Sequence, residues 1–230
     1  MRSQTTLARK SVMALTGLFL CVFLVTHLLG NLQLLMPAEK AQLQFNWYAT
    51  FLSSIIIIKM IAWLLFASIA AHVVYALILT VKNKQARNSQ YVYDARKNVS
   101  PWYTRNMGLL GTIILIFLMI HLKDFWYVYN YGNLPVDPQG HKDLYTIVVR
   151  AFSQWWYVAL HVIAFMALGY HLLHGFVSAF RTLGVYHQRY GKWLYYLGIC
   201  YTVVITLGFI CIPIYLFLSS LQGEPPVASS

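Results

Sequence analysis

The sequence is poor in charge, and above all in acidic residues. Of its 230 residues only 10% are charged and six are Asp or Glu, whereas 59% are hydrophobic. Soluble domains carry about 25% charged residues and fewer apolar ones. This composition therefore excludes an ordinary water-soluble protein, and we expect the chain to lie in a lipid bilayer.

Cysteine is also scarce. The chain has three, Cys21, Cys200 and Cys211, and all of them fall in apolar segments. They are too few and too dispersed for a disulfide framework or a cysteine-ligated metal site. We interpret them as small residues of the helical core.

Long apolar runs are what the chain does have. Five stretches are long enough to cross a hydrocarbon core of about 30 Å at about 1.5 Å per residue. They cover residues 11–35, 45–81, 106–129, 155–180 and 193–221. The connecting segments are too short for a soluble domain. The sequence thus predicts an all-α protein, a single domain over residues 1–230 with five transmembrane helices.

The basic residues are distributed unevenly. Of 17 Lys and Arg, twelve lie in the amino-terminal segment and in the second and fourth loops. They are Arg2, Arg9, Lys10, Lys82, Lys84, Arg87, Arg96, Lys97, Arg105, Arg181, Arg189 and Lys192. Because basic loops stay in the cytoplasm, we expect the amino terminus inside and the carboxy terminus outside. Contact with anionic lipid headgroups accounts for the net charge of +11, and no nucleic-acid partner is expected.

Histidines inside the apolar runs are the strongest functional signal, since such side chains are costly in a membrane. His27 and His121 lie about 25 and 24 Å from the cytoplasmic boundary, and His72 and His171 both lie about 15 Å from it. Two histidines at one depth are what a haem with two axial imidazoles needs. The sequence predicts two haems b, the outer ligated by His27 and His121 and the inner by His72 and His171. The alternative is four unrelated histidines that hydrogen-bond between helices.

Three further residues near these ligands are candidates for a role. His174 lies one turn from His171 and competes with it as a ligand. His161, about 30 Å from the cytoplasmic boundary, is expected to bind a quinone or to hydrogen-bond. Asp124, one turn beyond His121, could exchange a proton with a quinol; the competing interpretation is a solvated partner of Lys123. Glu39 is a weaker candidate for the same proton transfer.

Haem propionates at the membrane edge need cationic or hydroxyl partners. The sequence offers several near the cytoplasmic boundary. We expect Arg181 and Ser11 to contact the inner haem, with Arg9, Lys10 and Arg105 as further candidates. Arg181 is equally typical of the ordinary positive charge that follows a transmembrane helix.

The fourth apolar run carries a family pattern. His171 is followed by glycine four and thirteen residues later, at Gly175 and Gly184, whereas His174 meets neither spacing. In the first run, His27 follows Gly17 by ten residues. In these features the chain resembles the cytochrome b membrane anchor of succinate dehydrogenases and fumarate reductases, in the branch with one five-helix subunit and two haems.

The resemblance implies a set of partners and a location. These are a flavoprotein subunit and an iron–sulfur subunit on the cytoplasmic face, a quinone that is usually menaquinone near the outer haem, and a bacterial cytoplasmic membrane. The anchor itself would have no dicarboxylate site. Some family members place a glutamate for a proton path two residues before the fourth-run histidine, and here that position is Gly169.

Two other classes compete with this interpretation. The cytochrome b anchor of a hydrogenase or formate dehydrogenase also binds two haems, but it typically takes two ligands from one helix. A proton-coupled transporter could use histidine relays, but its usual broken helices and intramembrane acids are missing here.

Overall fold

The computed structural model describes residues 2–85 and 101–223, without the side chains of residues 2–6, 83 and 84. Within these ranges the chain forms helices and turns and no strand. Five helical segments are long and apolar enough to cross a membrane. They are Leu7–Leu35, Ile56–Lys82, Met107–Tyr131, Trp155–Thr182 and Gly191–Leu221. The predicted all-α, five-span architecture is confirmed.

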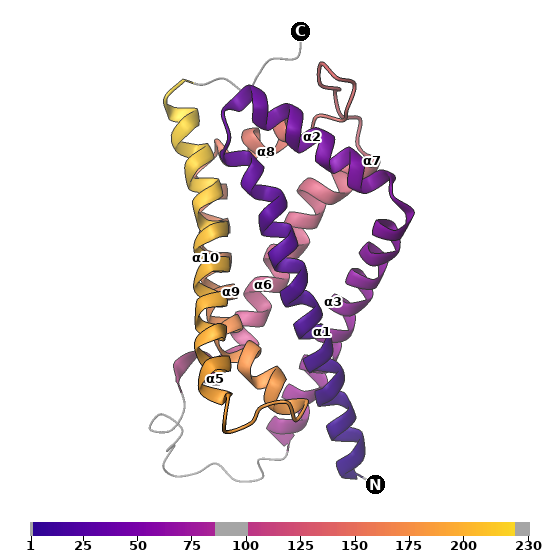
Figure 1. Ribbon diagram of the computed structural model, residues 1–230, viewed down its shortest axis with the longest axis vertical. Helices are drawn as coiled ribbons and strands as arrows, with labels where there is room; N and C mark the ends of the chain where they lie inside the picture. Colours follow the sequence, from indigo (N-terminus) through magenta and orange to yellow (C-terminus); the bar gives the residue numbers. More distant parts are fainter. Residues whose placement is uncertain (1, 86–100, 224–230) are drawn as a thin grey trace.

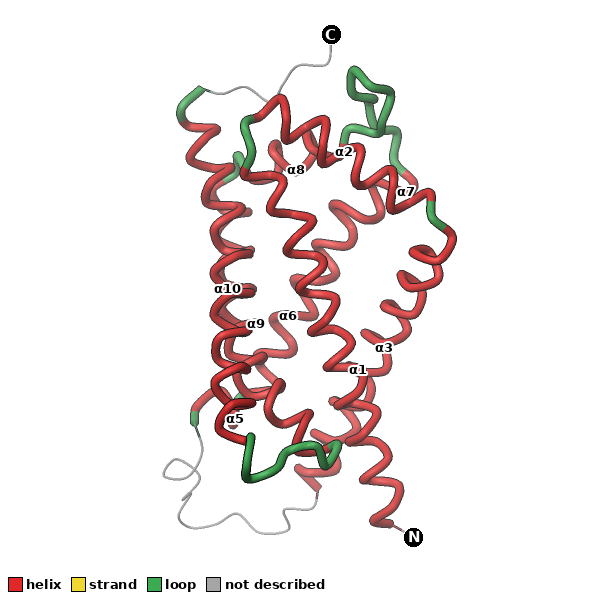
Figure 2. Tube along the Cα trace, viewed as in Figure 1, coloured by secondary structure: helices red, strands yellow, loops and turns green. Residues whose placement is uncertain are grey.

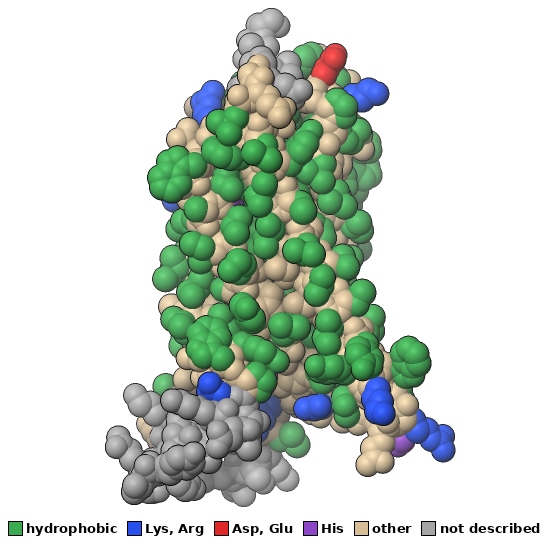
Figure 3. Space-filling view, turned by 90° about the vertical axis from the view of Figure 1, so that its left-hand side faces the viewer, with side chains coloured by type: hydrophobic (Ala, Val, Ile, Leu, Met, Phe, Trp, Pro, Cys, Tyr) green, Lys and Arg blue, Asp and Glu red, His purple; other side chains and the backbone are tan. Residues whose placement is uncertain are grey.

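Helix α9 (Trp155–Thr182) is the centre of the bundle. It packs against α10 (Gly191–Leu221), α6 (Met107–His121) and α1 (Arg2–Asn31), whereas α3 (Ile56–Gln85) packs mainly against α1. Helix α1 begins at one end of the bundle and α10 ends at the other (Figure 1). On the face drawn in Figure 3, hydrophobic side chains cover the middle, and most Lys and Arg side chains lie toward the two ends.

The two ends of the bundle differ. One end, here called the basic end, holds the start of α1 and α10 and the end of α9 (Figure 1). Its basic residues with described side chains are Arg9, Lys10, Lys82, Arg105, Arg181, Arg189 and Lys192, and the backbones of Arg2 and Lys84 lie in α1 and α3. Arg87, Arg96 and Lys97 lie outside the described residues. The opposite end is called the cap end.

The second apolar run does not form one helix, so the predicted span 45–81 begins too early, and the membrane span is Ile56–Lys82. Helix α2 (Ala38–Ser54) is followed by Ile55, whose extended backbone (φ −82°, ψ 121°) separates α2 from α3. As one helix those 37 residues would measure about 55 Å, well beyond the hydrocarbon core. Helix α2 instead lies across the cap end, after the 3₁₀ turn η1 (Leu32–Leu35; Figure 2).

A second short helix, α8 (Leu144–Phe152), completes the cap and was not predicted. Asp143, 1% exposed, joins it to α2. Its carboxylate accepts hydrogen bonds from Gln42 Nε2 (2.8 Å), Asn46 Nδ2 (3.0 Å), and the Thr146 amide and hydroxyl (3.1 and 2.7 Å). The Tyr145 amide donates in turn to Asn46 Oδ1 at 2.9 Å. These bonds explain how polar residues of α2 are buried against α8.

The Asp143 network predicts an acid-labile cap. Burial alone would raise the pKa of the Asp143 carboxyl, but hydrogen bonds from Asn46, Thr146 and Gln42 outweigh it and hold the pKa below its ordinary value. The stabilisation is complete above the unfolded pKa of about 3.9 and is lost as pH falls below it through the lowered value. Asp143→Asn replaces one carboxylate oxygen by an NH2 group, which cannot accept a hydrogen bond from the side-chain amide of Gln42 or Asn46. We expect this to lower the free energy of unfolding by about 2–3 kcal/mol. Thermal unfolding in detergent at pH 7 measures this loss.

The exposed Gln44 on the same helix supplies a matched control for this prediction. Gln44→Ala on α2 is expected to leave the unfolding temperature unchanged, because the Gln44 side chain is exposed, whereas Gln42 and Asn46 of the same helix are buried. An Asp143→Asn protein as stable as the parent at pH 7 would show that the cap does not depend on the carboxylate.

The third membrane span changes from α-helix to π-helix directly after His121. Helix α6 ends at His121 and continues as the π-helical turn η2 (Leu122–Tyr127) and the short α7 (Val128–Tyr131). Wider π-turns inside α-helices are rare and occur frequently at functional sites. This turn carries Asp124.

Candidate functional site

The structure brings the four predicted ligands together in two pairs, each from two helices. The ring centroids of His27 (α1) and His121 (α6) are 5.9 Å apart with an interplanar angle of 85°. Those of His72 (α3) and His171 (α9) are 6.2 Å apart at 62°. Since a metal binds imidazole nitrogen at about 2 Å, two rings on opposite sides of one metal have centroids about 6 Å apart. Both spacings match that arrangement.

The pairs lie at different depths. Helix α1 contacts both of them, His72 through Thr16 and His121 through His27. The eleven residues between these positions correspond to about 16 Å of helix axis. The separation predicted from the loop boundaries was about 10 Å. The His72/His171 pair is nearer the basic end, and the His27/His121 pair is nearer the cap end.

The donor set decides which kind of metal site fits. Among the described residues, no group of three or more His, Cys, Asp or Glu could hold a metal ion, so each pair offers two protein ligands. A zinc ion would need three or four. Haem iron receives four nitrogens from its porphyrin and needs only two axial ligands. The two imidazoles of each pair therefore match, in number and kind, the axial ligands that a haem iron takes from a protein.

The His72/His171 pair has small neighbours and one hydroxyl. His72 Nδ1 lies 3.2 Å from Thr16 Oγ1. A Cβ on Gly17 would lie 3.3 Å from His72 Cε1, and one on Gly111 would lie 4.0 Å from His171 Cε1. His171 Nδ1 is buried and has no hydrogen-bond partner within the described part of the chain. The two glycines leave room beside each ring.

The His27/His121 pair is surrounded by aromatic rings. His27 stacks on Phe23 at 5.2 Å and 19°, and lies 5.7 Å from Phe209. His121 lies between Phe117 (5.5 Å) and Phe125 (5.1 Å). These apolar walls exclude water and suit a large, flat, apolar cofactor.

His174 takes no part in either pair. Its Nδ1 lies 3.1 Å from Thr104 Oγ1, on the short helix α5 (Trp102–Arg105) at the basic end. Its ring is therefore held against α5, whereas His171 faces His72. Of the two histidines that compete in the sequence, the geometry favours His171 as the ligand.

The two candidates for propionate contacts lie toward the basic end. Ser11 is half-buried on α1. Arg181 is exposed near the end of α9, and its guanidinium carbon lies 4.6 Å from the centre of the Tyr186 ring. That cation–π contact engages Arg181 outside the bundle. A role of either residue toward a propionate stays a prediction.

A second cluster forms around Tyr157 on the cap side of His121. The Tyr157 hydroxyl donates to Asp124 Oδ2 at 3.0 Å, and Lys123 Nζ lies 3.4 Å from Asp124 Oδ1. The Lys123 side chain is 80% exposed and that of Asp124 only 30%. Asp124 thus meets the predicted partner Lys123, and it also contacts a buried tyrosine that the sequence analysis missed.

His161 belongs to the same cluster. It is 1% exposed, its ring lies 6.2 Å from that of His121, and its Nδ1 is 2.9 Å from the Tyr157 carbonyl oxygen. Because a carbonyl can only accept, Nδ1 carries the hydrogen and Nε2 of the neutral ring has a free lone pair. Within the described residues Nε2 has no partner. Tyr157 precedes His161 by four residues on one helix face, a spacing that could have identified it.

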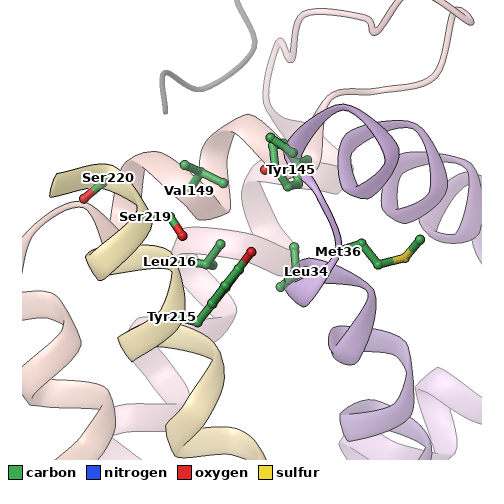
Figure 4. Close-up of a pocket in the computed structure, with 9 residues that line it drawn as sticks. Leu34, Met36, Tyr145, Val149, Tyr215, Leu216, Ser219 and Ser220 are labelled. Carbon is green, nitrogen blue, oxygen red and sulfur yellow. The ribbon is translucent and has the colours of Figure 1, made fainter. Parts of the chain in front are cut away.

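Two cavities lie near the cap end. One is lined by Leu34, Tyr145, Tyr215 and Leu216 among others (Figure 4), and its 20 Å³ hold no more than about one water molecule. The other is an open groove of about 330 Å³ between α3 and η2. Its walls are Phe66, Leu122, Lys123, Trp126 and Tyr127. Of these two, the groove is the one large enough for part of an organic ligand.

Comparison of the chain with protein-family models, with curated proteins and with solved structures gave no match. The fold and the site by themselves define a class, which is a multi-pass helical membrane protein with two facing histidine pairs at two depths.

Proposed function

We propose that the protein is the membrane anchor and electron-transfer subunit of a succinate:quinone oxidoreductase, with one haem b held by His27 and His121 and another by His72 and His171. The observation that carries the proposal is the pairing of histidines from four helices with centroid spacings of 5.9 and 6.2 Å. An anchor of the hydrogenase or formate dehydrogenase type would take two ligands from one helix, and here each helix gives one.

When bound, the haems would supply reversible one-electron chemistry at two depths of the membrane. The chain's own contribution is to hold the two rings of each pair 5.9 and 6.2 Å apart, at interplanar angles of 85° and 62°, and to surround them with apolar side chains. Phe23, Phe117 and Phe125 do this around the pair nearer the cap end. Ser11 and Arg181 are the proposed partners of the propionates at the basic end.

The distribution of charge supports an orientation and a set of partners. With its excess of Lys and Arg, the basic end faces the cytoplasm by the positive-inside rule, in the cytoplasmic membrane of a bacterium. The iron–sulfur subunit, with the flavoprotein subunit attached, docks on this face. A basic surface attracts an acidic partner over a long range.

The cluster around Tyr157 supports a quinone site at the cap end. A quinol must release protons when it is oxidised, so a base must lie within hydrogen-bond reach. Asp124 is the group proposed to exchange that proton, and His161 Nε2 has the free lone pair to accept a hydrogen bond from a quinol hydroxyl. The apolar groove beside Lys123 offers a path for an isoprenoid tail. Menaquinone is the quinone that the family resemblance implies.

Optical spectroscopy of the purified protein tests the proposal directly. We expect a pyridine haemochrome to give two haems b per chain, and a reduced-minus-oxidised spectrum to show low-spin bands. In the isolated complex, succinate should reduce at least part of this haem. A protein purified from haem-replete cells that shows no low-spin bands would contradict the proposal and favour the transporter class.

A further inference from the structure

A threonine on α1 holds one ring nitrogen of His72. Thr16 Oγ1 lies 3.2 Å from His72 Nδ1. The same hydroxyl donates its single hydrogen to the backbone, where the Val12 and Met13 oxygens lie 2.9 and 3.1 Å away. With that hydrogen on a carbonyl, the hydroxyl accepts from His72, and the His72 tautomer that completes this arrangement carries its hydrogen on Nδ1.

The neighbourhood of this contact supports the same tautomer. The Met13 backbone also acts on the His72 ring as a hydrogen-bond acceptor, which favours a hydrogen on the ring nitrogen that faces α1. With Nδ1 protonated, the lone pair of neutral His72 is on Nε2. The adjacent Gly17 has no side chain, and a Cβ there would lie 3.3 Å from His72 Cε1. The segment from Met13 to Gly17, here called the seat of His72, contacts the His72 imidazole in a way that fits one orientation of the ring.

Among the pair ligands this seat distinguishes His72. The Nδ1 atoms of its partner His171 and of His121 are buried without a hydrogen-bond partner in the described ranges of the chain. Helix α1 thus has two roles: it presents His27 to one pair, and eleven residues earlier it fixes the orientation of His72 in the other.

We infer that Thr16 is a positioning residue for the haem held by His72 and His171: it fixes His72 in the tautomer that directs Nε2 to the iron and makes the ring a stronger electron donor. The inference rests on the proposed function. A hydrogen bond from the far nitrogen of a ligating imidazole increases ligand basicity. A more basic ligand stabilises ferric over ferrous iron, so the Thr16 contact lowers the midpoint potential of this haem.

The test is Thr16→Val in the assembled protein, with a redox titration of each haem and an EPR spectrum. Valine keeps the branched shape and removes the acceptor. We expect the potential of the His72/His171 haem to rise, its low-spin EPR signal to shift, and its retention on washing to fall by about 10-fold. The other haem should keep its potential and spectrum, which shows that α1 is folded.

Two further variants make the result specific. Thr16→Ser retains the hydroxyl and is expected to restore the parent potential. Thr26→Val removes a hydroxyl on the same helix that donates only to the Phe23 carbonyl at 2.9 Å, and it is expected to change neither haem. An unchanged potential and EPR signal in Thr16→Val, with both haems present, would overturn the role of Thr16 and leave the proposed function intact. A parent protein without haem would instead refute the proposed function itself.

Discussion

Replacing His171 by alanine is expected to remove the haem nearer the basic end and to halve the haem content, even though His174 lies only one turn away. His171 is the residue whose ring faces His72 at 6.2 Å. His174 is held by Thr104 on α5, and a turn of α9 would have to unwind before its ring could reach the same position. The loss of one of two axial ligands leaves an open coordination position on the iron. Pyridine haemochrome analysis and the low-spin EPR signals measure the outcome.

His174→Ala is the matched control for this experiment. It removes a histidine from the same helix face and breaks the bond to Thr104, and it is expected to leave two low-spin haems. The His27/His121 haem should persist in both variants because none of its neighbours changes. If His171→Ala keeps two haems with parental spectra, or if His174→Ala loses one, the assignment of His171 is wrong.

The histidine pairs could be predicted because helix geometry converts sequence position into depth. A straight membrane helix rises about 1.5 Å per residue, so the distance of each histidine from the nearest basic boundary was sufficient to match His27 with His121 and His72 with His171. Their side chains then had to face inward, since an imidazole exposed to lipid is costly. No contact had to be known in advance.

The cap could not be predicted in the same way, because hydropathy does not distinguish a helix that crosses the membrane from one that lies on the bundle end. Phe45 and the residues after it continue an apolar run, and the break at Ile55 involves neither Pro nor Gly. The signal that was overlooked is Gln42 and Asn46. Their partner Asp143 is about a hundred residues away in sequence, and contacts at that separation follow only from the packed structure.

The cluster at Asp124 was predicted in part. Its distance from His121 along the helix identified a carboxylate near a proposed haem ligand. The π-turn that directs Asp124 toward α9 has no evident sequence signature, and the hydrogen bond from Tyr157 depends on it. The sequence therefore left two interpretations of Asp124, a proton-exchanging group and a solvated partner of Lys123. In the structure Asp124 contacts the buried Tyr157 as well as the exposed Lys123.

Asp124→Asn is expected to abolish quinone-linked turnover while both haems and the oxidation of succinate by an artificial acceptor remain. Asparagine has the same shape and its Oδ1 can still accept from the Tyr157 hydroxyl, so the local packing is preserved. It cannot take up a proton at neutral pH. General acid–base groups contribute about 100-fold or more to rate, and quinol reduction or oxidation should fall by that factor. Steady-state assays with a menaquinone analogue and with the artificial acceptor separate the two activities.

Two variants show whether the effect belongs to the Asp124 carboxylate. Glu39→Gln neutralises an exposed carboxylate at the same end of the bundle and is expected to leave turnover unchanged. Tyr157→Phe keeps the carboxylate but removes the hydrogen bond that holds it inward, so it should lower turnover less than Asp124→Asn and shift its pH dependence. Undiminished quinone turnover in Asp124→Asn would exclude the carboxylate as the proton-exchanging group. In that case Asp124 would have a structural role alone, through the hydrogen bond from Tyr157 and the ion pair with Lys123. An exposed ion pair of this kind contributes at most about 1 kcal/mol.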